Sequence, residues 1–186
     1  MTGVLSWLAL GILLGWVVFA VALLVTGAAA AVAVGATAAA VCVFLLRDTV
    51  ALRGAMALLA PFGVMLPALA LRHAAVKFGA PVPGFATWEL ALFLLAYMAF
   101  LATAFGVIPV DLYRLGYAPA PVALMVLAVC GYGAVTGNWF LPLVAVLGQA
   151  GWIMGWGSSN WFDHVTHVLL VPVAAVALLG RVPLSW

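Results

Sequence analysis

Long apolar runs with almost no charge recur from one end of this chain to the other, and they limit its folding more than any other feature. Each run is roughly the 20 residues that a helix needs to cross ~30 Å of hydrocarbon. Only 5% of the 186 residues are charged and 69% are hydrophobic, whereas about a quarter of residues in soluble domains carry charge. The sequence therefore predicts an all-α, polytopic helical bundle that forms one transmembrane domain over residues 1–186, without a soluble domain.

We place seven membrane-crossing segments on these runs, with six as the alternative. The count depends on very short links, Gly27 and residues 158–160, which must close helical hairpins. Longer connections contain Pro81, Pro83 and Pro109, and proline favours turns. The predicted segments are 4–26, 28–46, 54–71, 86–108, 118–136, 139–157 and 161–180.

Prolines and small residues inside the segments predict how the helices bend and pack. A proline within a helix removes a backbone hydrogen bond and pushes on the carbonyl four residues earlier, so we expect kinks at such positions. The prolines concerned are Pro67, Pro142 and Pro172. Glycines four residues apart predict close helix packing, and the examples are Gly11 with Gly15 and Gly151 with Gly155.

Charge and the first segment bear on the class of protein. The formal net charge is +2 and no block of Lys and Arg occurs, so nucleic acid is excluded as a partner. The apolar run 4–25 has no basic region before it and is longer than the core of a secretory signal, so we expect a retained first helix. We expect a multi-pass protein of a prokaryotic inner or plasma membrane. Its expected partners are lipids and either a larger membrane complex or further copies of the chain.

Seven crossings would sort the charged residues between two membrane faces. The face on the side of Met1 would hold Arg47, Arg53 and Arg114, and the other would hold Arg72, Lys77 and Arg181. Equal numbers give the positive-inside rule no preference, so the orientation stays open. The three aspartates fall on the Met1 face, whereas His73 and Glu89 fall on the other. We interpret His73 as part of a basic edge facing lipid phosphates and Glu89 as a first-turn acid that complements the helix dipole.

The stretch SSNWFDHVTH, residues 158–167, concentrates the polar chemistry. Asp163 and His167 are four residues apart, and His164 and His167 are three apart, so on one helix their side chains are neighbours. A carboxylate and two imidazoles are ligands for a divalent metal such as zinc, iron or copper. We therefore predict a metal or cofactor site formed by Asp163, His164 and His167, with Asp48 and Asp111 as auxiliary ligands.

Structural roles explain part of the same stretch. Asn160 and Asp163 have the spacing of a helix cap, with Asn160 as N-cap and the carboxylate near the positive end of the helix dipole. Trp161 is typical of an aromatic anchor at the membrane interface. Neither role explains the histidines. His167 would lie inside the apolar region, where an ionisable residue is a candidate functional group.

Three functional hypotheses remain open. The first is a membrane hydrolase or redox enzyme acting on a lipid-soluble substrate, because a metal at the cluster would activate water or bind a carbonyl oxygen. The second is a non-catalytic transporter subunit, or an accessory or assembly subunit of a larger membrane complex. The third is a proton relay or pH sensor that uses the near-neutral titration of histidine. The residues identify neither a catalytic set nor a specific cofactor.

Overall fold

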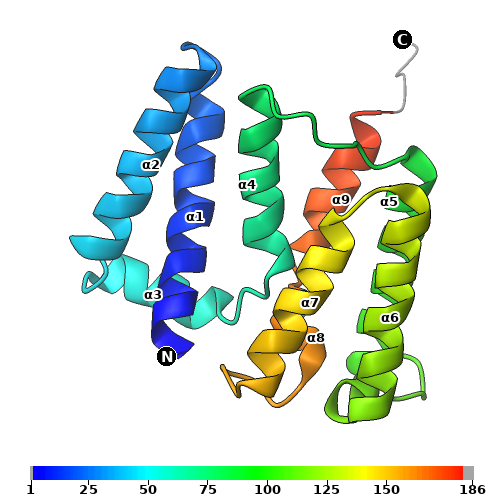
Figure 1. The fold of residues 1–186 in the computed structure, drawn as a ribbon. Coiled ribbons are helices and arrows are strands. Elements are labelled where there is room, and N and C mark those ends of the chain that lie inside the picture. Colours follow the sequence, from blue (N-terminus) through cyan, green and yellow to red (C-terminus); the bar gives the residue numbers. More distant parts are fainter. Residues whose placement is uncertain (1, 182–186) are drawn as a thin grey trace.

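The computed structural model describes residues 2–181, and within that range the chain is all-helical and contains no strand. The predicted helical class is therefore confirmed. The elements, drawn in Figure 1, are α1 (Thr2–Ala22), α2 (Ala28–Phe44), α3 (Val50–Leu59), α4 (Met65–Lys77), α5 (Thr87–Ala104), the short 3-10 helix η1 (Tyr113–Tyr117), α6 (Pro119–Thr136), α7 (Phe140–Ile153), α8 (Trp161–Val165) and α9 (Leu170–Leu179).

Three helices, α1, α5 and α6, are long and apolar enough to cross a membrane. The helices α2, α7 and α9 are apolar but shorter, and α4 has 13 residues. In Figure 1, α1, α4, α6 and α9 run away from the end where the N-terminus lies, and α2, α5 and α7 run back toward it. The helix α3 lies across that end. We call it the near end of the bundle and the opposite end the far end.

Two of the predicted segments are interrupted. The predicted segment 54–71 covers the end of α3, the link 60–64 and the start of α4. The predicted segment 161–180 covers α8, the link 166–169 and α9. Both places have the same order: a short helix toward the near end, a break, and a helix that runs to the far end (Figure 1). The prediction of one continuous helix in each place is wrong.

Prolines mark where the second helix of each pair begins. Pro67 and Pro172 are the third residues of α4 and α9, and Pro142 is the third residue of α7. The N–H groups of a first helical turn have no partner inside the helix, so a proline there removes no hydrogen bond. Its ring would clash with a helical turn continuing before it. The predicted kinks are therefore wrong, because these prolines begin helices.

Glycines bring α1 and α2 into close contact. A Cβ atom on Gly15 would lie 2.6 Å from the Gly35 carbonyl oxygen, and one on Gly35 would lie 2.7 Å from the Gly15 carbonyl oxygen. The predicted close packing of small residues is confirmed for this pair. Gly155 behaves differently, because it lies beyond the end of α7 with a φ of +66° and a Cβ there would meet nothing within 4 Å.

The buried core is concentrated around the two interruptions. Phe62, in the first link, is 2% exposed, while Val165 and Leu170 on either side of the second link are 5% and 1% exposed. Trp161 is 5% exposed, so the predicted interfacial anchor is a core residue instead. The core therefore reaches into both interruptions, although Ala60, Pro61 and Val168 of the links are themselves exposed.

Candidate functional site

Two hydrogen bonds join the link 60–64 and the end of α3 to the link 166–169 and α8. The Val64 N–H donates to the His164 carbonyl oxygen at 2.7 Å, and the Leu59 carbonyl oxygen accepts from His167 Nε2 at 2.8 Å. Gly63, with a φ of +58°, lies so close to the second link that a Cβ there would be 2.5 Å from the Thr166 carbonyl oxygen. Each interruption therefore supplies a hydrogen-bond partner to a backbone group in or beside the other.

Asp163 is held from two sides. Its Oδ2 accepts hydrogen bonds from the hydroxyls of Tyr113 at 2.7 Å and Ser158 at 2.6 Å. Burial, together with the hydrogen bond to the Asp163 carboxylate, raises the pKa of the Tyr113 hydroxyl above its usual value. Tyr113 stays protonated as a donor for that reason. No side-chain or backbone donor in residues 2–181 bonds to Oδ1 of Asp163, so this oxygen is available to a ligand.

Helix capping positions both partners of this pair. Asn160 is completely buried and is the N-cap of α8, as predicted, with its Oδ1 accepting from the Phe162 N–H at 2.9 Å. Its Nδ2 donates to the Tyr113 carbonyl oxygen at 2.8 Å. One amide side chain therefore fixes the start of α8, which carries Asp163, and also the start of η1, which carries Tyr113.

A cavity of about 450 Å³ lies where the two links, α5 and η1 meet. Its polar lining comes from Tyr97, Tyr113, Asp163, Thr166 and His167. The rest of the wall is apolar and consists of Leu58, Leu59, Ala60, Pro61, Phe100, Leu101, Ala104, Phe105, Phe162 and Val168. The cavity therefore combines one polar side with a larger apolar one.

The two histidines point to different places. His164 Nε2 is 2.7 Å from the Ser158 carbonyl oxygen, and its Nδ1 faces Gly151, where a Cβ would lie 3.1 Å away. His164 does not line the cavity. His167 does, but both of its nitrogens are engaged, because Nε2 donates to the Leu59 carbonyl oxygen and Nδ1 accepts from the Leu169 N–H at 3.1 Å. This pair of bonds requires the neutral ring with its hydrogen on Nε2.

The metal site predicted at the cluster has no support in the structure. Across residues 2–181 no group of three or more His, Cys, Asp and Glu side chains could hold a metal ion. The physical reason is the end of α8 at Val165, with Thr166 in an extended conformation. His167 is consequently not one helical turn beyond Asp163, so Asp163, His164 and His167 do not present a shared set of ligands.

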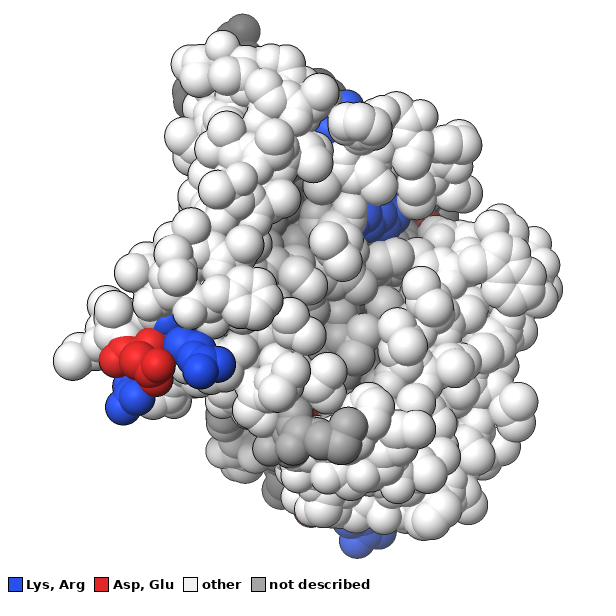
Figure 2. All heavy atoms as spheres, turned by 60° about the vertical axis from the view of Figure 1, so that its left-hand side comes forward, with Lys and Arg blue, Asp and Glu red and all other residues white. Residues whose placement is uncertain are grey.

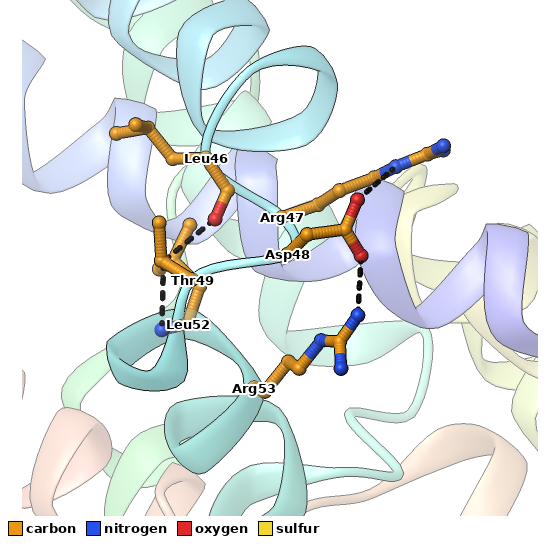
Figure 3. A network of polar contacts seen from close by, with 6 residues as sticks. All are labelled: Leu46, Arg47, Asp48, Thr49, Leu52 and Arg53. Carbon is orange, nitrogen blue, oxygen red and sulfur yellow. Dashed lines mark hydrogen bonds and ion pairs between the residues drawn. The ribbon is translucent and has the colours of Figure 1, made fainter.

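The two predicted auxiliary ligands belong to other networks. Asp48 accepts a hydrogen bond from Arg53 at 2.7 Å and lies 3.6 Å from Arg47 Nε (Figure 3). The hydrogen bond from Arg53 holds the pKa of the Asp48 carboxyl below its usual value. In Figure 2, one cluster of acidic and basic side chains stands out on a mostly uncharged face, with further charged side chains at separate places. Asp111 accepts from the Arg114 N–H at 3.0 Å.

The far end holds the remaining acid and histidine. His73 Nδ1 accepts from the Trp16 indole N–H at 2.9 Å, so this histidine bonds to α1, and its predicted lipid-facing role stays a prediction. Glu89 lies in the first turn of α5, as predicted, where its carboxylate accepts from the Ala86 N–H and the Tyr132 hydroxyl. Both residues have structural partners and lie outside the cavity.

Sequence reasoning missed the tyrosines of the site. Tyr113 and Tyr97 line the cavity, but neither is in the stretch 158–167. One signal could have identified Tyr113. It lies two residues after Asp111, in a connection without the apolar periodicity of a helix, where a polar side chain can have a functional role.

A scan against protein-family models, a search of curated proteins and a search of solved structures each found no match. A function for this chain is therefore proposed from the geometry of the site alone.

Proposed function

We propose that the chain crosses the membrane seven times, through α1, α2, α4, α5, α6, α7 and α9. The alternating directions of these helices in Figure 1 support this count. The 13 residues of α4 and the 10 residues of α9 cover about 20 and 15 Å, which is short of the ~30 Å hydrocarbon core. The links 60–64 and 166–169 would therefore lie at membrane depth, with α3 and α8 on their near-end side.

Cysteine labelling tests the seven crossings. In a variant with Cys42 and Cys130 replaced by alanine, Asp111→Cys and Lys77→Cys are expected to react with a membrane-impermeant maleimide from opposite sides of sealed vesicles. The reason is that Asp111 precedes η1 at the near end and Lys77 ends α4 at the far end. Labelling of both positions from the same side would contradict the arrangement.

We further propose that the protein binds a lipid-soluble molecule that carries a hydrogen-bond donor, in the cavity between the two links. The observation that carries this proposal is the cavity itself, whose lining combines Asp163, a carboxylate with one oxygen unbonded among the described residues, with a wall of aromatic and aliphatic side chains. Its volume of about 450 Å³ is within the ~300–1,000 Å³ of small-molecule sites. Interrupted helices that line a cavity are also where membrane transporters build their solute sites.

The arrangement favours binding or transport over hydrolysis. A hydrolase needs a nucleophile within hydrogen-bond reach of a general base. Ser158 does bond to Asp163, but Ser158 does not line the cavity, and the ring of His167 is committed to two backbone groups. Asp163 can accept a hydrogen bond or a proton from the bound molecule, with Tyr113 stabilising its charge. This chemistry supports the role of a membrane carrier, or of a binding subunit of a transporter.

Mass spectrometry of the lipid-soluble molecules that co-purify with the full chain tests the binding proposal. Asp163→Asn is expected to reduce the retained molecule by about tenfold or more, because a hydrogen bond to a charged group contributes ~1.5–3 kcal/mol. Asp111→Asn is the matched control, since it removes an exposed near-end carboxylate outside the cavity. Equal retention by wild type and Asp163→Asn, or an equal loss in both variants, would refute the assignment.

A further inference from the structure

Two arginines from different helices hold the same stretch of chain at the far end. Arg72, near the end of α4, donates from Nη2 to the Pro83 carbonyl oxygen, and Arg181, directly after α9, donates from Nη1 to the Phe85 carbonyl oxygen. These carbonyls belong to the connection that crosses the far end between α4 and α5 (Figure 1). The two guanidinium groups are thereby brought to one place in the fold.

The Arg72 side chain is held in position by aromatic contacts. Its guanidinium carbon lies 4.5 Å from the centre of the Phe85 ring and 5.5 Å from that of Phe140, so two aromatic faces hold it. Its Nε is buried and has no hydrogen-bond partner in the part of the chain that the structure describes. Since a guanidinium carries five N–H donors, donors remain after the bond to Pro83.

Within residues 2–181 no carboxylate forms an ion pair with either of these arginines. The ion pairs among residues 2–181 join Asp48 to Arg47 and Arg53. Glu89, the acid of the far end, has one oxygen bound by the Ala86 N–H and the other by the Tyr132 hydroxyl. Like charges that are close together and partly removed from water repel one another. An anion that bound both guanidinium groups would offset this repulsion.

We propose that Arg72 and Arg181 form a binding site for a phosphate group. The planar guanidinium matches a phosphate with two parallel N–H donors, and the far end is the level at which α4 and α9 would leave the hydrocarbon. Lipid headgroup phosphates lie at that level, and soluble phosphate compounds reach it from water. This site is separate from the cavity, so it stands or falls independently of the proposed ligand of Asp163.

Thermal unfolding of the purified full chain in a mild, uncharged detergent tests this site. We expect phosphatidylglycerol to raise the midpoint temperature by about 5 °C or more, and phosphatidylcholine, in which a cationic choline accompanies the phosphate, to raise it less. A shift produced by millimolar inorganic phosphate alone would assign the site to a soluble phosphate compound. Absence of any shift with either probe would overturn the proposal.

Variants distinguish binding at Arg72 and Arg181 from a general attraction between the anionic lipid and the positive charge of the protein. Arg181→Gln, at an exposed position, is expected to lose more than half of the shift. Arg72→Lys keeps the charge but loses the planar fork, and is expected to lose a similar part. Arg114→Gln removes the same charge at an exposed near-end position and should keep the full shift. An equal loss in Arg114→Gln, or a full shift in Arg181→Gln, would overturn the proposal.

Discussion

Replacing Gly63 with alanine is expected to lower the free energy of unfolding by about 3 kcal/mol. Gly63 has a φ of +58°, a left-handed conformation that costs a residue with a Cβ about 1–2 kcal/mol. The new Cβ would also lie 2.5 Å from the Thr166 carbonyl oxygen and 2.9 Å from the Val165 carbonyl carbon. Because these are backbone atoms, no side-chain rotation relieves the contact, and the two links must move apart. Unfolding by a denaturing detergent titrated into mild micelles measures the loss.

Gly106→Ala is the matched control for this experiment. Gly106 also has a left-handed conformation, with a φ of +73°, but a Cβ there would meet nothing within 4 Å. Its replacement is expected to cost only the backbone term of about 1–2 kcal/mol. If Gly63→Ala and Gly106→Ala lost the same stability, the contact between the two links would not contribute to folding.

The helical class and most helix positions were predictable because apolar runs of membrane length have few alternative structures. The predicted ranges 86–108 and 118–136 contain α5 and α6, whose sequences are largely apolar. The link 60–64 was not predictable in this way, since its residues, Ala-Pro-Phe-Gly-Val, are as apolar as their neighbours. The break depends on a hydrogen bond from the Val64 N–H to the His164 carbonyl oxygen. The hydropathy of the local sequence does not predict a contact with a residue so far along the chain.

The role of the prolines could not be predicted from the local sequence either. A proline is compatible with the first turn of a helix and with a kink inside one, so the sequence around Pro172 fits both. The structure begins α9 two residues before Pro172, because the preceding chain turns away to bring His167 Nε2 to the Leu59 carbonyl, 108 residues earlier. The outcome was decided by this distant contact rather than by the local pattern.

The candidate site was only partly predictable for a related reason. Asp163 and His167 stand out as polar residues in an apolar chain, and both line the cavity. Tyr113 was missed because its bond to Asp163 joins positions 50 residues apart. The predicted ligand set rested on a continuous helix, so it lost its support when α8 was found to end at Val165.

Asn160→Ala is expected to lower the free energy of unfolding by about 3 kcal/mol. The completely buried Asn160 caps α8 through Oδ1, and loss of an N-cap costs about 1 kcal/mol. Its Nδ2 is also the donor to the Tyr113 carbonyl oxygen, and an unpaired polar group in the interior costs a further ~1–3 kcal/mol. Since the same amide joins α8 to η1, the Tyr113 hydroxyl should also lose its alignment with Asp163, and the molecule retained in the cavity should decrease.

Thr49→Ala separates the capping contribution from the link to η1. Thr49 is an exposed N-cap of α3, whose Oγ1 accepts from the Leu52 N–H at 3.5 Å and donates to the Leu46 carbonyl oxygen at 2.7 Å. Its replacement therefore removes a cap and one local bond, and no contact with η1. We expect a loss of about 1 kcal/mol or less and unchanged retention of the cavity molecule. If Asn160→Ala lost no more stability than Thr49→Ala and kept the molecule bound, Asn160 would be only a helix cap. The alignment of Tyr113 with Asp163 would then have to come from the aromatic contact of the Tyr113 ring with Phe162, whose centroid lies 6.4 Å away.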